Sequence, residues 1–345
     1  MQAGNQPERE SSVDAQARAQ QRRDWVRDAT GKSDPEIVVA SADASFRSYW
    51  RVRNLPNTPI VMDAPPGRED IAPWIAIAQR LHASGLHAPG VYASDASLGF
   101  VLMEDLGDRT YLPALGAGTV DALYDEALAA LLVMQRDVGC AGLPDYDRER
   151  LRQELELMPC WFIGRHLGIA PRGEETEALD AAFHALVEAA LAQPQVFVHR
   201  DYHSRNLLIT DTNSPGIIDF QDGVRGPIAY DLVSLLRDCY IAWPESRVDD
   251  WVEQYRERAV SAGLTNADAR TFRRWFDWIG VQRHVKVLGI FCRLWYRDGK
   301  RHYLADLPRV WQYTHDVASR YAELAPLAAL LERFIAERDL TRPTP

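Results

Sequence analysis

The sequence predicts an α+β fold with two lobes, a small lobe of strands and one helix followed by a larger, mostly helical lobe. Short β-branched or aromatic runs, EIVVAS, FRSYWRV and PIVMDAP, lie between residues 36 and 65 and are separated by turn-forming residues. Two further strand-like runs, GVYASD and GFVLMEDLG, follow after one helical pattern. After Gly107, apolar residues recur at helical spacing over most of the chain, and residues 196–227 form the one non-helical island.

The changes of pattern set the expected boundaries. Residues 1–20 are polar and poor in apolar side chains, so we expect a disordered lead-in, and residues 21–30 predict a short helix. Together they form an N-terminal segment over residues 1–33. The small lobe is expected over residues 34–106 and the large lobe over residues 107–345.

Composition and charge exclude several classes of protein. The chain has 345 residues, of which 46% are hydrophobic, and a formal net charge of −10. An acidic chain is a poor match for the phosphate backbone of nucleic acids, and no apolar run approaches the roughly 18–20 residues that a membrane span needs. The four cysteines form no CxxC pair and the first ten residues hold no apolar signal-peptide core, which favours the cytoplasm. We expect a monomer or weak dimer without nucleic-acid or membrane partners.

The non-helical island carries residues with a chemical pattern. His199, Arg200 and Asp201 are followed by Asn206, and Asp219 comes after the next apolar run. The Asp201 carboxylate can accept or orient the proton of an attacking hydroxyl, while the amide oxygen of Asn206 and the carboxylate of Asp219 can ligate Mg²⁺. This HRDxxxxN sequence with a later DF pair resembles the catalytic loop of the protein-kinase superfamily. The resemblance implies ATP and Mg²⁺ as cofactors, Asp201 as the catalytic residue, and Asn206 and Asp219 as the metal ligands.

The small lobe departs from the general kinase pattern. Where the third strand of a kinase carries a lysine for the ATP phosphates, PIVMDAPP has Met62 and Asp63. A cation must still meet the phosphate charge. Arg47, Arg51 or Arg53 could supply it, and we favour Arg47 because it lies nearest to the preceding loop.

Two other segments are expected to contact the nucleotide. SADAS stands where kinases have a glycine-rich loop, and its small side chains would let backbone N–H groups approach phosphate, although it could also be a plain β-turn. EDLG follows a strand, as the adenine-binding hinge does in kinases, and could equally be an ordinary turn. The predicted nucleotide-binding residues are Ser41, Ala42, Ser45, Arg47, Glu104 and Leu106.

The region after the DF pair narrows the resemblance. Only twelve residues separate Asp219 from Asp231, too few for a phosphorylated activation loop. The chain is therefore similar to the aminoglycoside and choline kinase branch, small-molecule kinases of bilobal, protein-kinase-like fold with an antiparallel sheet in the N-lobe. More narrowly, SADASFRSYWRV, VMDAPP, HRDYHSRNL, IDFQD and QRHVKVLGIFCRLWYRDGK resemble the anomeric kinases of cell-wall amino sugars. This implies ATP-dependent phosphorylation of N-acetylmuramate or N-acetylglucosamine at C1, in peptidoglycan recycling.

Basic residues gather late in the chain, in residues 273–301, which contain eight lysines and arginines and two acidic residues. Arg283, Lys286 and Arg293 share one face of a helical pattern with Arg297. Such a face suits the carboxylate of N-acetylmuramate, whereas a polycationic aminoglycoside needs an acidic pocket. We expect the first three to bind the substrate; a solvated helix face is the alternative.

Three more residues lie close in sequence to the catalytic carboxylates. His203 and Asp222 are expected to contact the hydroxyl or acetamido groups of the sugar. Asp231 precedes the run LVSLLRDCY and is expected to cap the start of that helix. In the resembled family an acidic residue at this place instead braces the catalytic loop.

Two other functions stay open at this stage. One is a different small-molecule kinase of the same branch, acting on an aminoglycoside, choline or homoserine. The other is a nucleotide-binding regulator without catalysis, which the missing third-strand lysine favours and the intact Asp201, Asn206 and Asp219 oppose.

Overall fold

The computed structural model describes residues 6–42 and 47–343, with side chains from residue 15 and not for residues 41–42. The chain forms two compact units. The first contains the described residues up to Asp108 together with Thr210–Gln221, and the second contains Arg109–Ile209 and the residues from Asp222 onward. The boundary after Asp108 lies two residues beyond the expected end of the small lobe at residue 106. The segment Thr210–Gln221 was expected in the large lobe.

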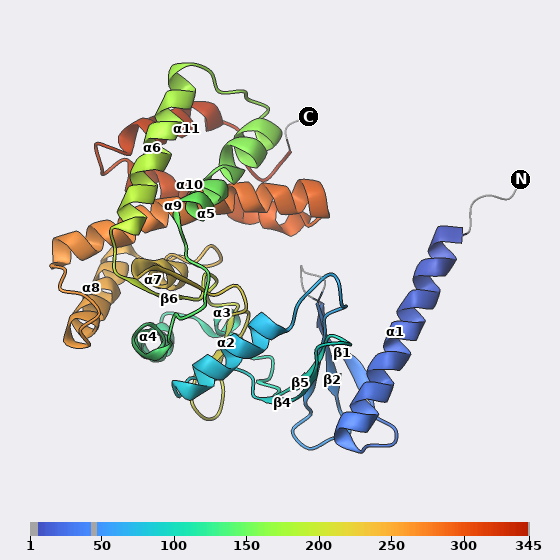
Figure 1. The fold of residues 1–345 in the computed structure, drawn as a ribbon. Helices are drawn as coiled ribbons and strands as arrows, with labels where there is room; N and C mark the ends of the chain where they lie inside the picture. The colour runs from blue at the N-terminus through green and yellow to red at the C-terminus, as the bar shows by residue number, and fades with distance from the viewer. Residues whose placement is uncertain (1–5, 43–46, 344–345) are drawn as a thin grey trace, which may run out of the picture. The chain divides into compact units, whose positions relative to one another are not determined.

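The first unit is built on a five-stranded antiparallel sheet (Figure 1). The strands, in their order across the sheet, are β1 (Ile37–Ala42), β2 (Ser48–Val52), β3 (Ile60–Asp63), β5 (Phe100–Met103) and β4 (Val91–Asp95). All residues of β3 and β5 are buried, and β4 at the edge alternates between partly buried and exposed side chains. These burial patterns are typical of central strands covered on both faces and of a half-solvated edge strand.

The N-terminal helix differs from the prediction. Helix α1 (Gln6–Thr30) is one helix of 25 residues, so the expected disordered lead-in over residues 1–20 is wrong for the residues from Gln6 onward. Arg18 and Arg22 each place a guanidinium nitrogen 2.7 Å from the carboxylate of Asp63 on β3. Val26 joins the buried cluster of the sheet. Tertiary contacts therefore stabilise a helix whose own composition is mostly polar.

The segment Thr210–Gln221 belongs to the first unit through both backbone and side chains. The Ile217 N–H donates to the carbonyl of His87 at 2.8 Å. Phe220 packs on Trp74 of α2 (Ala72–Ala83) with ring centroids 5.1 Å apart. The segment contains the short strand β8 (Gly216–Ile217). Asp219 is therefore positioned by the first unit.

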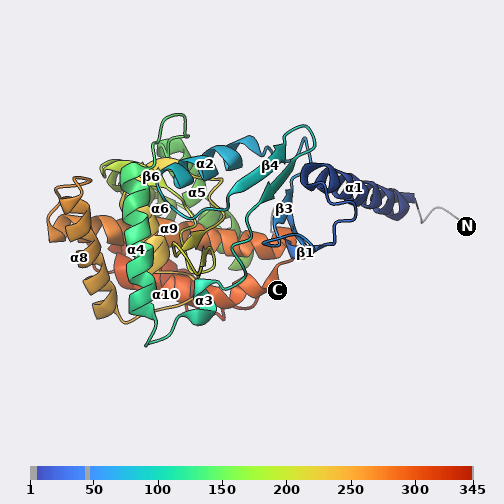
Figure 2. The same ribbon diagram turned by 90° about the horizontal axis from the view of Figure 1, so that it is seen from below.

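The second unit is mostly helical, and several helices gather around the long helix α9 (Figure 1). Its strand β6 (Gln195–Val198) pairs with β9 (Val224–Pro227), and Figure 2 shows α4 and α8 side by side. Among the described residues, no helix has both the length and the apolar character of a membrane span. The other elements are α3 (Tyr111–Ala114), α4 (Val120–Asp137), α5 (Arg148–Leu155), a π-helical segment (Met158–His166), α6 (Glu174–Leu191), β7 (Leu207–Leu208), α7 (Ala229–Leu236), α8 (Glu245–Ser261), α9 (Ala269–Asp298), a 3₁₀ segment (Arg301–Asp306), α10 (Leu307–Ala318) and α11 (Ala325–Ile335).

Gly289 permits the closest backbone approach to α9. A Cβ atom at this position would lie 2.3 Å from the carbonyl carbon of Leu157 and 2.5 Å from its oxygen. Backbone atoms cannot move aside as a flexible side chain can, so only glycine fits here.

Substitution Gly289→Ala should lower the thermal unfolding midpoint by about 4–8 °C, because overpacking of this kind costs about 2–3 kcal/mol. The matched control is Gly280→Ala in the same helix, where the nearest atom to the added Cβ is Arg237 Nη1 at 3.4 Å. The control should equal or exceed the parent midpoint, since the added Cβ has room and alanine improves helix propensity by about 1 kcal/mol. Equal midpoints for the two variants would contradict the packing argument.

Candidate active site

The HRDxxxxN loop lies in the second unit, directly after β6. The pairing of β6 with β9 ends at Val198, opposite Val224, and the chain then turns. Within the loop, the His203 N–H donates to the carbonyl of Asp201 at 3.0 Å. The side-chain amide of Asn206 donates to the same carbonyl at 3.0 Å. Asn206 is therefore oriented by the backbone of Asp201, five residues earlier.

Asp231 braces the start of this loop. Its carboxylate accepts from the backbone N–H of His199 at 2.6 Å and from that of Arg200 at 3.0 Å, and it is fully buried. The expectation that Asp231 caps the helix is wrong, because α7 begins at Ala229 and Ile228 occupies the cap position. Strand pairing has ended at Val198, so the carboxylate supplies the acceptors that a partner strand would otherwise provide.

Asp238, just beyond the C-terminal end of α7, holds the second half of the loop. Its carboxylate accepts from both the N–H (3.0 Å) and the hydroxyl of Ser204, and from the N–H of Tyr240 at 3.0 Å. The Tyr240 ring contacts the His203 ring edge-to-face at 5.4 Å and lies under the Arg205 guanidinium at 3.5 Å. Sequence reasoning missed Asp238, because its partner in the loop, Ser204, lies 34 residues earlier.

Arg200, whose role the sequence left open, forms a buried ion pair. Its backbone has φ +77°, and its Nη2 lies 2.5 Å from Oε1 of Glu154 in α5. Lys286 Nζ lies 2.9 Å from the same oxygen and donates to the hydroxyl of Tyr230 at 3.2 Å. Tyr146 donates to the other oxygen of Glu154. Arg200 thus connects the loop to α5 and, through Glu154, to α9. Lys286, one of the predicted substrate-binding residues, already has a partner within the protein.

The Asp201 carboxylate is surrounded by cationic side chains. Burial acts to raise the pKa of Asp201, but the charges of His203, Lys286 and Arg283 outweigh it and hold the pKa below its ordinary value. Asp201 is therefore a carboxylate at neutral pH. A carboxylate of low pKa can orient a hydroxyl and accept its proton as a weak base.

The basic face of α9 does not act as one unit. Arg283 is 3% exposed and donates to the thiol sulfur of Cys239 at 3.4 Å. Arg293 lies ten residues further along, about 15 Å along the helix axis. Burial lowers its pKa, and the nearby charges are those of Arg297 and Asp298. Arg283 and Lys286 are among the charges with the largest effect on the pKa of Asp201.

The two remaining predicted sugar contacts differ in their surroundings. Burial lowers the pKa of His203 against the opposing charges of Asp238 and Asp201. Its Nδ1 is buried and has no hydrogen-bond partner among the described residues. Asp222 is exposed in the turn that precedes β9.

Asp219 lies in the first unit, and Asn206 in the second. The Asp219 backbone has φ +65°, a left-handed conformation that is uncommon for a non-glycine residue and is frequent at functional sites. Gln221 Nε2 donates to its Oδ1 at 2.7 Å. One carboxylate and one amide oxygen suit Mg²⁺, which keeps waters and phosphate oxygens as its other ligands. Within residues 6–42 and 47–343, no three His, Cys, Asp or Glu side chains form a cluster that could hold a metal.

The predicted hinge is part of the sheet edge. The Glu104 N–H donates to the Gly90 carbonyl at 2.8 Å, and its carboxylate accepts from the Gly90 N–H at 3.1 Å. The carboxylate also lies 3.2 Å from Nε2 of His87. Leu106 follows two residues later and is partly buried. The Glu104 side chain thus fixes the start of this connection.

The predicted phosphate-binding residues lie at the end of β1, just before β2 and in the segment between them. Ser41 and Ala42 end β1, Ser45 lies outside the described residues, and Arg47 is partly buried immediately before β2. Arg51 is engaged elsewhere, with its Nε 2.5 Å and Nη2 3.1 Å from the carboxylate of Asp105.

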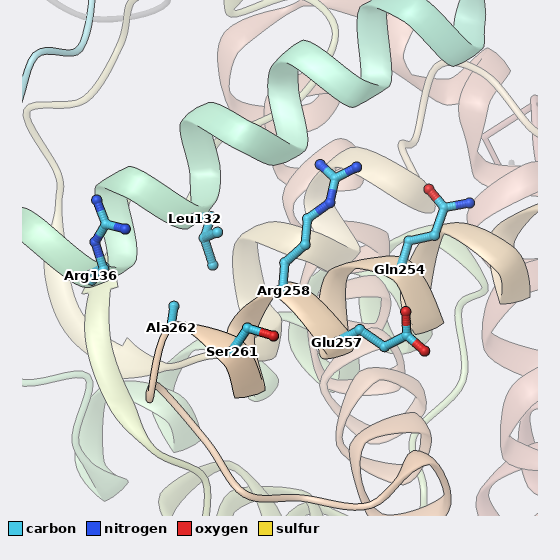
Figure 3. Close-up of a pocket in the computed structure, with 7 residues that line it drawn as sticks. All are labelled: Leu132, Arg136, Gln254, Glu257, Arg258, Ser261 and Ala262. Carbon is cyan, nitrogen blue, oxygen red and sulfur yellow. The ribbon is translucent and has the colours of Figure 1, made fainter.

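A separate open groove of about 700 Å³ lies on the second unit, where α4 faces α8 (Figure 3). It contains none of the loop residues described above. Arg258 points across it and pairs with Asp125 of α4. The groove is lined by Leu132, Arg136, Gln254, Glu257, Arg258, Ser261 and Ala262.

Known proteins with similar sequences cover most of this chain. It is 43% identical over 296 residues to a protein of Pseudomonas putida, which covers 86% of this chain and 87% of that protein. It is 42% identical over 324 residues to a protein of Neisseria meningitidis serogroup B, with 92% and 96% covered. Each of these proteins is named N-acetylmuramate/N-acetylglucosamine kinase.

Solved structures show the same fold at low sequence identity. An ADP-bound aminoglycoside phosphotransferase matches with a TM-score of 0.58 at 14% identity, over 85% of this chain and 97% of that one. A choline kinase from Streptococcus pneumoniae matches with a TM-score of 0.57 at 13% identity, over 81% and 94%. The predicted protein-kinase-like α+β fold is thereby confirmed. The model of the phosphotransferase enzyme family matches residues 36–275, and the chain therefore belongs to this family.

Proposed function

We propose that this protein transfers the γ-phosphoryl group of ATP to the anomeric hydroxyl of N-acetylmuramate or N-acetylglucosamine, which gives the sugar 1-phosphate. The observation that carries the proposal is the braced loop of the second unit. It presents Asp201 as a carboxylate between cationic side chains, with Asn206 oriented by the same backbone. The names of the relatives at 42–43% identity support the choice of sugar.

The acidity of the acceptor fits Asp201. An anomeric hydroxyl is more acidic than the other hydroxyls of a sugar, so it needs only a weak base. The pKa of Asp201 is held below its ordinary value, which makes this residue such a base. Asp201 would accept the hydroxyl proton while the hydroxyl oxygen faces the terminal phosphate of ATP.

Asn206 and Asp219 would hold Mg²⁺, as their oxygen ligands suit this ion. Held by these two residues, the ion would supply positive charge that stabilises the phosphates of ATP during transfer. Arg47 stays our choice for the cation that meets the phosphates beside Ser41, Ala42 and Ser45. The backbone groups of Glu104 and Leu106 would read adenine.

The same surroundings argue against the alternatives. A polycationic aminoglycoside would meet Arg283 and Lys286 near Asp201, and the repulsion between these like charges would oppose its binding. A regulator without catalysis would not need an ionised Asp201 in a loop whose start is held by the Asp231 carboxylate.

Substitution Asp201→Asn should lower kcat by about 10³-fold or more, because the amide cannot accept the hydroxyl proton. The affinity for ATP should be retained, as measured by calorimetric titration. Asp145→Asn, at an exposed carboxylate of the same unit, is the control and should keep the parent kcat. An Asp201→Asn enzyme with parent turnover would exclude the assigned role.

The acceptor can be identified by product analysis. N-Acetylmuramate and N-acetylglucosamine should be phosphorylated, and choline and kanamycin should be inert under the same conditions. Because the phosphate is placed on C1, the product should no longer reduce copper or ferricyanide until acid hydrolysis releases the sugar. A product that stays reducing would place the phosphate on another hydroxyl, and consumption of choline or kanamycin alone would refute the proposed substrate.

Asp238 should act as a positioning residue for the loop. Asp238→Ala removes the acceptor for Ser204 and Tyr240, and each lost bond to a charged group is worth about 1.5–3 kcal/mol. We expect kcat to fall by about tenfold or more with little change in the KM for ATP. Asp238→Asn keeps an oxygen acceptor and should recover part of the loss. A purely structural role would instead lower the melting midpoint of both variants with kcat per folded molecule unchanged.

A further inference from the structure

Arg283 is a buried cation that lacks an acidic partner. Only 3% of the residue is exposed, yet no carboxylate oxygen of the described residues lies within the 4.0 Å limit of an ion pair. Its Nε is buried and has no hydrogen-bond partner in this part of the chain. Other buried arginines do have an acidic partner: Arg22 pairs with Asp63, and Arg237 pairs with Asp277.

The one hydrogen bond of Arg283 supplies no counter-charge. Its Nη1 donates to the sulfur of Cys239 at 3.4 Å. Burial raises the pKa of the Cys239 thiol to about 11, so the thiol is neutral at pH 7 and is a weak acceptor. A guanidinium cannot lose its proton in a protein. A buried, unpaired charge costs several kcal/mol, and a bound anion would remove that cost.

Arg283 lies where a substrate would meet it. It is one helical turn before Lys286 on α9, and the charges of both residues act on the Asp201 carboxylate. Lys286 is already paired with Glu154 at 2.9 Å. Of Arg283 and Lys286, Arg283 is therefore the residue whose positive charge has no carboxylate of the described residues within ion-pair distance.

We propose that Arg283 binds the lactyl carboxylate of N-acetylmuramate and so selects for the anionic amino sugar. The inference rests on the proposed function and adds the residue that separates its two substrates. A carboxylate can receive two parallel N–H bonds from a guanidinium, which gives both affinity and orientation. N-Acetylglucosamine has the same ring without the lactyl group and would leave Arg283 without an anion.

The test compares the two sugars in the parent enzyme and in Arg283→Gln. The kcat/KM for N-acetylmuramate should fall about 100-fold, whereas N-acetylglucosamine should lose only the smaller factor that follows, for both sugars, from removing a positive charge near Asp201. Arg283→Lys retains the charge without the two-pronged geometry and should lie between these values for N-acetylmuramate. Arg274→Gln, on the same helix and paired with Glu323, is the control and should leave both values unchanged.

A chemical variant makes the test independent of folding. The methyl ester of N-acetylmuramate lacks the carboxylate charge, so the parent enzyme should use it about 100-fold less efficiently than the acid. Arg283→Gln should use ester and acid equally well. The inference is overturned if the parent enzyme does not distinguish ester from acid, or if Arg283→Gln loses the same factor with both sugars. Failure of the parent enzyme on both sugars would instead refute the proposed function.

Discussion

The position of the catalytic loop depends on one buried carboxylate, that of Asp231. Strand pairing ends at Val198, and the next two amides, of His199 and Arg200, donate to Asp231 instead. A buried amide without an acceptor costs about 1–3 kcal/mol, so the turn is favourable only with α7 in place. In this turn, Arg200 has a left-handed backbone conformation, and its side chain pairs with Glu154.

The parts of the fold that could be predicted are those that local pattern determines. The strands of the sheet follow from short β-branched or aromatic runs, and helix α2 follows from helical spacing over a few residues. Of helix α1, only residues 21–30 could be predicted in this way, because the stability of the rest depends on Asp63, 41 residues after Arg22. Asp231 shows the same limit: its sequence context suits a helix cap, and only the tertiary structure reveals the two loop amides that it accepts.

In the candidate site, too, local pattern predicts some residues, whereas others depend on tertiary contacts. The spacing of Asp201, Asn206 and Asp219 could be recognised, since it reflects a chemistry that needs those groups in that order. Helical periodicity also placed Arg283 and Lys286 on one face, and both act on Asp201. It could not distinguish their roles, because the partner that occupies Lys286 is Glu154, 132 residues earlier on α5. Residues that pair across such separations leave no local pattern in the chain.

The ion pairs between α1 and Asp63 have a consequence for synthesis on the ribosome. The helix leaves the exit tunnel before Asp63 and the sheet residues that bury Val26, such as Phe100, which are translated later. An isolated helix of polar composition is marginal in water. Helix α1 therefore stays unfolded in the nascent chain until Phe100 has also left the tunnel, and it then docks on a sheet that was synthesised after it.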